Sequence, residues 1–237
     1  QWQDYLEREQ GVKALVVNSG EKNRIRQILE LCRKLIPSKQ GKSIHAMIMG
    51  IPNVGKSTLI NILAGRIIAK TGNEPAVTKA QQRISLGDNF FLHDTPGVLW
   101  PKIHNEHSGY RLAVTGAIKS TAMEHEDVAF YAVEYLLKAY PEQMQQRYHL
   151  DELPHTELEF LEQIGAKRGC LRKGGRVDLN KISEILLTEL RAGTLGPISL
   201  ETPEMCEEEV RQVAIAEEKK AAKKALQKKK KTSNRQR

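Results

Sequence analysis

Apolar positions in residues 1–100 follow two patterns, short continuous runs and runs in which apolar residues recur every three or four positions. The short runs are typical of strands, and the spaced runs are typical of helices with one buried face. The predicted elements are a strand at 13–18, a helix at 22–36, a strand at 43–49, a helix at 56–64 and strands at 80–86 and 90–93. The run at 43–49 is nearly all apolar, which predicts a parallel strand covered on both faces. This alternation favours an α/β domain with a mostly parallel sheet.

From about residue 120 the apolar spacing becomes helical throughout. Phe130, Val133 and Leu137 fall on one face of a first segment, and similar faces follow around Leu161 and Leu186. We therefore expect an all-helical second domain after the sheet. The predicted division of the chain is 1–119 for the α/β domain, 120–200 for the helical domain and 201–237 for a charged tail.

Charge is concentrated at the carboxyl end of the chain. The 237 residues carry a net charge of +8, and residues 219–237 alone hold eight Lys and two Arg without an acid. The preceding segment, 201–218, holds seven Glu against one Arg. Such a low-complexity segment cannot bury enough apolar surface to order itself, so we expect a flexible or loosely helical tail. It is suited to binding a polyanion, or simply to keeping the protein in solution.

The composition also excludes several classes of protein. Cys32, Cys170 and Cys206 are scattered and lack CxxC spacing, which argues against a disulfide framework or a zinc site and favours a reducing, cytoplasmic location. No apolar run approaches the roughly 20 residues that a membrane-spanning helix needs. The chain opens at Gln1 with charged residues following, so we expect it to be processed or to be a piece of a longer protein.

A phosphate-binding motif lies between the strand at 43–49 and the helix at 56–64. Residues 50–57, GIPNVGKS, fit the pattern G-x-x-x-x-G-K-[ST], in which curled backbone N–H groups and a helix amino terminus surround an anion. Lys56 is predicted to reach the β- and γ-phosphates of a nucleotide, and the Ser57 hydroxyl to bind Mg²⁺. The alternative is a glycine-rich turn that matches by chance, which the strand–loop–helix context disfavours.

A second motif, DTPG at 94–97, directly follows the strand at 90–93. Asp94 is predicted to hold Mg²⁺ through water at the carboxyl end of that strand, and Gly97 to offer its amide to the γ-phosphate. Thr78, in an extended loop, is the candidate switch threonine that binds Mg²⁺ while the γ-phosphate is present, and Thr71 is a weaker rival. D-x-x-G alone is a weak pattern, and an ordinary turn is the alternative.

The base-reading motif of GTPases, N-K-x-D, is missing from its usual place after D-x-x-G. Residues 98–200 contain only NKIS at 180–183, in which serine stands where a carboxylate is needed. A strand and a helix that would usually follow the switch loop are instead predicted before the phosphate loop. The residues at the end of that strand, Asn18 and Ser19, look like the short loop that backs the base. The simplest interpretation is a circular permutation that places the base-reading elements first, with N-K-x-D upstream of Gln1.

These motifs resemble those of the circularly permuted ribosome biogenesis GTPase A family. The resemblance covers most of the chain and is carried by GIPNVGKSTLIN at 50–61, IAKTG at 68–72, DTPGVLWPK at 94–102, RLAVTGAIK at 111–119 and KRGCL at 167–171. It implies a monomeric P-loop GTPase that uses GTP, GDP and Mg²⁺ and acts in late assembly of the large ribosomal subunit. Its helical domain would contact rRNA, with neither DNA nor a membrane as partner. Ala76 departs from the family pattern, which usually has glycine there.

The motifs and the resemblance together assign roles to individual residues. The predicted nucleotide contacts are Asn18, Ser19, Asn53, Val54, Gly55, Lys56, Ser57, Thr58, Asp94 and Gly97. The predicted catalytic residues are Lys56, Thr78 and Gly97. Asn53 matches a phosphate-loop asparagine that helps bind K⁺ in related GTPases, and a solvent-facing amide is the alternative of equal weight. Val98 stands where Ras-like enzymes have a water-orienting glutamine, so we expect slow basal hydrolysis.

A basic loop separates two of the predicted helices of the second domain. Its sequence, KRGCLRKGGR at 167–176, holds five basic side chains and three glycines, a composition that lets a loop follow a phosphate backbone closely. The predicted RNA-binding residues are Lys167, Arg168, Arg172, Lys173 and Arg176. A solvated loop without a partner is the alternative.

Three functions stay open from the residues alone. The first is a Mg²⁺-dependent GTPase switch in ribosome assembly. The second is a non-catalytic rRNA-binding module with a vestigial nucleotide site, and the third is a P-loop ATPase. The intact phosphate loop and the switch aspartate favour catalysis, while GTP over ATP rests on the family resemblance.

Overall fold

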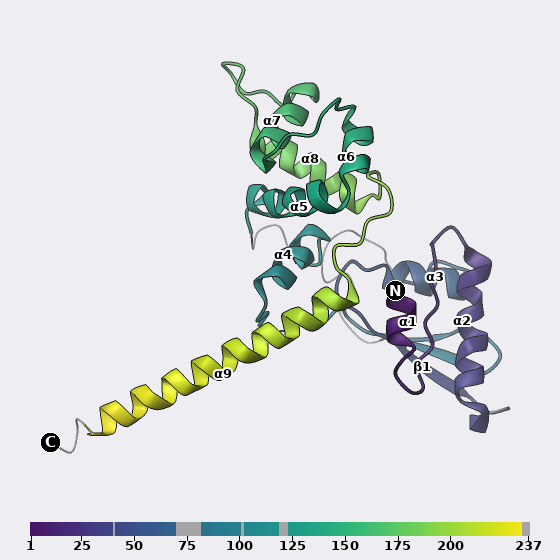
Figure 1. Cartoon of the computed structure of the whole chain (residues 1–237). Coiled ribbons are helices and arrows are strands. Elements are labelled where there is room, and N and C mark those ends of the chain that lie inside the picture. Colours follow the sequence, from purple (N-terminus) through teal and green to yellow (C-terminus); the bar gives the residue numbers. More distant parts are fainter. Residues whose placement is uncertain (40, 70–81, 101, 119–122, 234–237) are drawn as a thin grey trace.

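The computed structural model describes residues 1–39, 41–69, 82–100, 102–118 and 123–233. Figure 1 shows a sheet-containing part, formed by the first half of the chain, beside a cluster of helices formed by the second half. The chain begins with a short helix, α1 (Trp2–Leu6). A long helix, α9 (Pro203–Ser233), starts near α1 and projects away from both parts.

All three strands of the described residues lie where the sequence predicts strands. They are β1 (Ile44–Ile48), β2 (Gln82–Ser85) and β3 (Phe90–Asp94), in the spatial order β1-β3-β2. β3 runs parallel to β1 and antiparallel to β2. The prediction of a mostly parallel sheet is therefore corrected to a mixed one, because the short turn between β2 and β3 forces those two strands to run in opposite directions.

One face of this sheet packs against helix α3 (Lys56–Ala64), and α3 packs against α2 (Lys22–Leu35). α2 and α3 confirm the two predicted helices. Ile60 of α3 forms a core with Leu92 of β3 and Ile84 of β2. Helix α3 therefore lies on the face of the sheet to which these apolar side chains point, and this packing fixes the start of α3 at the end of β1.

The opposite face of β1 is exposed in the described residues, so the prediction that this strand is covered on both faces is wrong for this part of the chain. Met47 is 57% exposed, and His45 is also exposed. The ring of His45 stacks on Phe91 of β3 and lies 3.2 Å, nitrogen to nitrogen, from His93. The apolar run at 43–49 predicted the strand correctly, but such a run does not indicate which of its faces is covered.

Residues 13–18, predicted as a strand, form no strand and pair with none in the described part of the chain. Val16 is 61% exposed. The backbone amide of Ala14 donates to the carboxylate of Glu7 at 3.0 Å instead of joining a sheet. The apolar composition predicted this strand wrongly, because a strand also needs a neighbour that satisfies its N–H and C=O groups.

The second half of the chain is helical, as predicted. The helices are α4 (Glu106–Val114), α5 (His125–Ala139), α6 (Pro141–Tyr148), α7 (Glu157–Lys167) and α8 (Leu179–Arg191). Their buried side chains form one core that includes Ala113 and Val114 of α4. Helix α4 therefore packs with the helical part although it precedes residue 120, and the division at 119/120 stays a prediction.

Helix α9 covers most of the tail that composition predicts to be flexible or loosely helical. The guanidinium of Arg111, a buried side chain of α4, pairs with the carboxylates of Glu201 and Glu209, and His104 pairs with Glu217 farther along α9. Composition cannot show such partners, so it left open whether this segment is flexible or helical. Although α9 is 31 residues long, neither it nor another helix of the described residues is apolar enough over a sufficient length to cross a bilayer.

Candidate nucleotide-binding site

The phosphate loop joins β1 to α3, in the arrangement that the motif predicts. Gly55 caps the amino terminus of α3, and Ser57 and Thr58 lie in the first turn of that helix. The amides of a first helical turn have no partner within the helix, and together with the helix dipole they favour an anion. Asn53 and Val54 of the same loop are exposed. The loop therefore presents the donors that a nucleotide phosphate needs.

Lys56, the first residue of α3, reaches back across the phosphate loop. Its ammonium donates to the carbonyl oxygens of Gly50 at 3.0 Å and Ile51 at 2.7 Å. Burial lowers the pKa of Lys56, and the negative charge of Asp94 acts in the opposite direction. A cation thus sits beside the backbone of the loop, within electrostatic reach of the switch carboxylate.

Asp94 ends β3 directly beside the start of the phosphate loop. It is 1% exposed and lies opposite Ile48, the last residue of β1. The hydroxyl of Thr95 donates to the carbonyl of Ile48 at 2.7 Å and ties the two strand ends together. Asp94 and the Ser57 hydroxyl offer the oxygen ligands that Mg²⁺ prefers. Two such ligands are enough, because Mg²⁺ usually completes its coordination with water molecules and phosphate oxygens of the substrate. Among the described residues, no group of three or more His, Cys, Asp or Glu side chains is placed to hold a metal ion by itself.

The switch turn after Asp94 packs directly on the phosphate loop. A Cβ atom added to Gly97 would lie 2.9 Å from both the Cα and the nitrogen of Pro52, closer than real Cβ atoms approach other atoms. The amide of Val98 donates to the carbonyl of Gly50 at 3.4 Å. Only glycine permits this approach at position 97. A shift of the phosphate loop would therefore displace the switch turn.

A contact that sequence analysis missed links the phosphate loop to the helical part. The side-chain amide of Asn53 donates from Nδ2 to the carbonyl oxygen of Gly116 at 2.7 Å. Gly116 lies just beyond the end of α4, and the backbone of Asn53 is in the left-handed region, with φ of 60°. The sequence predicts Asn53 as a nucleotide contact whose amide either binds K⁺ or faces solvent, and not as a contact with the helical part. No sequence signal pairs positions so far apart.

The other predicted nucleotide contacts are less clearly placed. Asn18 and Ser19 are exposed, and the Asn18 side chain accepts a hydrogen bond from the amide of Gly20 at 2.9 Å, which closes the loop before α2. Within the described ranges, no hydrogen bond joins these two residues to the phosphate loop. The predicted switch residue Thr78 and its rival Thr71 lie outside the described residues.

Several predicted RNA-binding residues already have partners within the protein. Lys167 donates to the carbonyl of His149 at 2.6 Å, at the carboxyl end of α6. Arg168 pairs with the carboxylate of Glu189 on α8 at 2.8 Å. These two side chains hold α6, α7 and α8 together, so their charge is partly committed to the fold.

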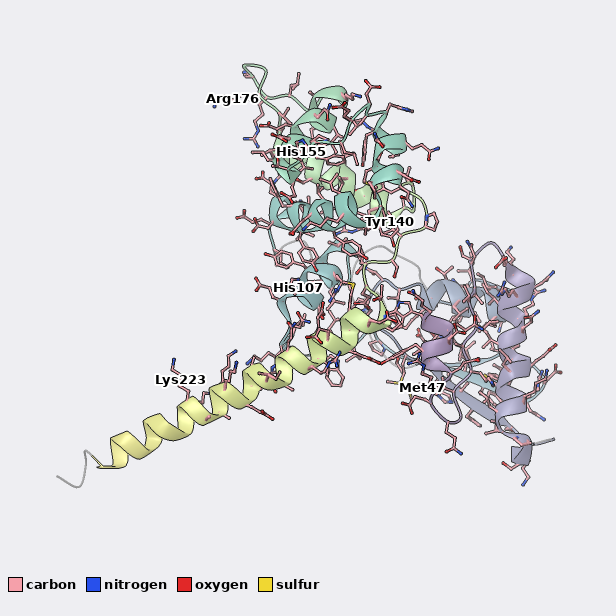
Figure 2. All side chains as sticks on the ribbon, viewed as in Figure 1. Met47, His107, Tyr140, His155, Arg176 and Lys223 are labelled. Atoms are coloured by element: carbon pink, nitrogen blue, oxygen red, sulfur yellow. The ribbon has the colours of Figure 1, made fainter. Side chains whose placement is uncertain are left out.

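The tip of the basic loop is more open. Arg172 pairs with Asp178, the residue that caps α8, and its hydrogen bond lowers the pKa of the Asp178 carboxyl. Lys173 and Arg176 are exposed and form no ion pair with the described residues. Figure 2 shows Arg176 at the outer end of the helical part, far from the sheet. These two cations are the residues of the loop that best suit an external polyanion.

A phosphate loop after β1, together with a switch carboxylate at the end of the neighbouring parallel strand, defines a P-loop nucleotide-binding domain of the GTPase type. A family model described as 50S ribosome-binding GTPase matches residues 45–164. Ribosome biogenesis GTPase A from Priestia megaterium is 45% identical over 218 residues, which cover 88% of this chain and 75% of the relative. The same-named protein from Bacillus cereus is 45% identical over 227 residues, with 92% and 76% covered.

Solved structures show the same fold. GNP-bound YlqF from T. maritima matches with a TM-score of 0.61 and 27% identity, covering 86% of this chain and 75% of that chain. A GDP-bound structure of the same name matches with a TM-score of 0.59 and 27% identity, covering 86% and 76%. The chain belongs to the ribosome biogenesis GTPase A family. It hydrolyses GTP to GDP and acts in ribosome biogenesis, so the vestigial-site and ATPase alternatives have no support in these comparisons.

Proposed function

We propose that the protein is a GTP-dependent switch that binds the large ribosomal subunit late in its assembly. The contact between Gly97 and the phosphate loop carries this proposal, because a γ-phosphate held at that loop would meet the switch turn directly. The description of the matching family, 50S ribosome-binding GTPase, supports the large subunit as the partner.

The residues of the site take the following roles in this proposal. Lys56 and the first-turn amides of α3 bind the phosphates, and Gly97 offers its amide to the γ-phosphate. Ser57 and Asp94 hold Mg²⁺, Asp94 through water, and Thr78 joins them from outside the described residues. When bound, Mg²⁺ neutralises charge that develops on the phosphate oxygens. The buried position of Asp94 and its electrostatic influence on Lys56 support this assignment.

We further propose that the chain is circularly permuted and that Asn18 and Ser19 back the guanine base. Their loop immediately precedes α2, which packs against the phosphate-loop helix α3. The elements that read the base therefore adjoin those that bind the phosphates, although they come first in the sequence.

A potassium ion bound beside Asn53 is proposed to supply part of the stabilisation of transition-state charge. Val98 is apolar and 66% exposed, so the residue in the usual glutamine position cannot orient water. A K⁺ ion takes oxygen ligands, for which Oδ1 of Asn53 is the relevant atom, while Nδ2 contacts Gly116.

Hydrolysis of GTP is expected to be faster in KCl than in NaCl at equal ionic strength. Stabilisation by about 1.4 kcal/mol corresponds to roughly a tenfold difference in rate. Phosphate release measured in both salts checks this, and replacing Asn53 by alanine should abolish the difference. Equal rates for the unaltered protein in the two salts would remove K⁺ from the proposal.

The basic loop is proposed to bind rRNA through Lys173 and Arg176. Replacing both by alanine is expected to weaken binding to the large subunit. The fall of log affinity with log salt concentration should also become less steep by roughly 2, about one for each lost phosphate contact. Co-sedimentation with large subunits over a range of salt concentrations, with a non-hydrolysable GTP analogue present, measures both quantities.

A matched variant controls for the change in total charge. Replacing Arg24 and Lys34 of α2 by alanine removes the same two charges from the sheet-containing part. This variant should keep the salt slope of the unaltered protein. Equal binding and equal slopes for the loop variant and the unaltered protein would contradict the proposed role of the loop.

A further inference from the structure

Arg191, the last residue of α8, joins that helix to the end of α4. Its Nε donates to the carbonyl of Val114 at 2.8 Å, and its Nη2 donates to the carbonyl of Ala113 at 2.7 Å. The last carbonyls of a helix have no partner within the helix and carry partial negative charge, so a guanidinium satisfies both needs. The side chain keeps contact with solvent, yet burial lowers the pKa of Arg191.

Gly116 lies between this guanidinium and the phosphate loop. A Cβ atom added to Gly116 would lie 3.3 Å from Nε of Arg191, and the backbone there has a φ of +77°, which favours glycine. The carbonyl of the same residue accepts the 2.7 Å hydrogen bond from Asn53. A continuous path of contacts therefore leads from α8 through one turn of backbone to the nucleotide site.

A cavity of about 1480 Å³ lies beside this path, and its lining includes Ile51 and Asn53 of the phosphate loop together with Gly116 and Arg191 of the helical part. A closely packed interface would hold the loop by many weak contacts. Beside a cavity, the hydrogen bond from Asn53 to Gly116 contributes more to the position of the loop.

We propose that Arg191 is a positioning residue for the nucleotide site. It fixes the turn at Gly116, and that turn holds Asn53 and the backbone of the phosphate loop in the conformation that aims the loop amides at the phosphates. This inference rests on the nucleotide site proposed above. It assigns the helical part a role in nucleotide binding in addition to any contact with RNA.

Replacing Arg191 by alanine is expected to free the Asn53 side chain and to speed the release of nucleotide. The ¹⁵N-labelled side-chain amide of Asn53 should shift in NMR spectra of the nucleotide-free chain. The release of a fluorescent GDP analogue should become about fivefold faster, the factor for one typical hydrogen bond. Replacing Arg191 by lysine, which keeps a donor for the carbonyls, should restore part of the slow release.

Two further variants separate positioning from a general effect on the fold. Replacing Arg147 of α6 by alanine also removes a cation that pairs with α8, at Glu189, but should leave nucleotide release unchanged. Replacing Asn53 by alanine should make the Arg191 substitution nearly silent, because two changes to one path are not additive. Circular dichroism establishes that each variant keeps its helices.

Two results would overturn the inference. An unchanged Asn53 amide signal and unchanged release in a folded Arg191→Ala variant would show that Arg191 only joins α4 to α8. Failure of the unaltered chain to bind the GDP analogue would instead contradict the nucleotide site itself, and the inference with it.

Discussion

Replacing Lys56 by alanine is expected to abolish tight nucleotide binding. The ammonium now donates to two loop carbonyls, those of Gly50 and Ile51, so it lies inside the loop that must hold the phosphates. Hydrogen bonds to charged groups contribute about 1.5–3 kcal/mol each, and the loss of two such bonds to phosphate lowers affinity on the order of a hundredfold or more. Isothermal titration with GDP and with a non-hydrolysable GTP analogue measures the loss.

Two other substitutions give this experiment its controls. Lys42→Ala removes an exposed lysine just before β1 and should leave affinity unchanged. Lys56→Arg keeps the charge but not the compact ammonium, so its affinity should fall between those of the alanine variant and the unaltered chain. Unchanged affinity in Lys56→Ala, with the chain still folded, would count against the whole proposed site.

Much of the fold could be predicted from the sequence because the relevant signals are local. The strand at 90–93 and the helix at 56–64 follow from apolar spacing over a few residues, and the structure confirms both. The strand at 13–18 could not be judged in this way, because strand formation depends on a neighbour elsewhere in the chain. Arg111, the one charged residue in the run YRLAV at 110–114, was an overlooked signal that a buried ion pair anchors α9.

The same distinction between local signals and contacts with distant parts of the chain applies to the candidate site. The phosphate loop and Asp94 were predictable, since each motif lies within one strand end and the turn that follows it. The contact of Asn53 with Gly116 and the role of Arg191 were not, because they depend on how the sheet-containing part and the helical part face each other. Patterns of apolar and polar residues carry no information about such a pairing.

Replacing Gly97 by alanine is expected to slow GTP hydrolysis while GDP binding changes little. The added methyl group would lie 2.9 Å from backbone atoms of Pro52, and backbone cannot move aside as a flexible side chain does. The switch turn must therefore shift away from the phosphate loop, which also breaks the contact between Val98 and Gly50. Overpacking of this kind costs about 1–3 kcal/mol, which corresponds to roughly a tenfold to hundredfold lower rate if the displacement falls on the transition state.

Single-turnover hydrolysis of labelled GTP measures this rate, and titration with GDP tests the binding separately. Gly109→Ala is the matched control, because the nearest atom to its added Cβ is the Cγ2 of Ile103 at 4.0 Å. Within helix α4 that change should leave hydrolysis unaltered and stabilise the fold by about 0.5–1 kcal/mol. If Gly97→Ala hydrolysed GTP as fast as the control, the switch turn would not need to touch the phosphate loop. The γ-phosphate would then have to be sensed by another segment of the chain.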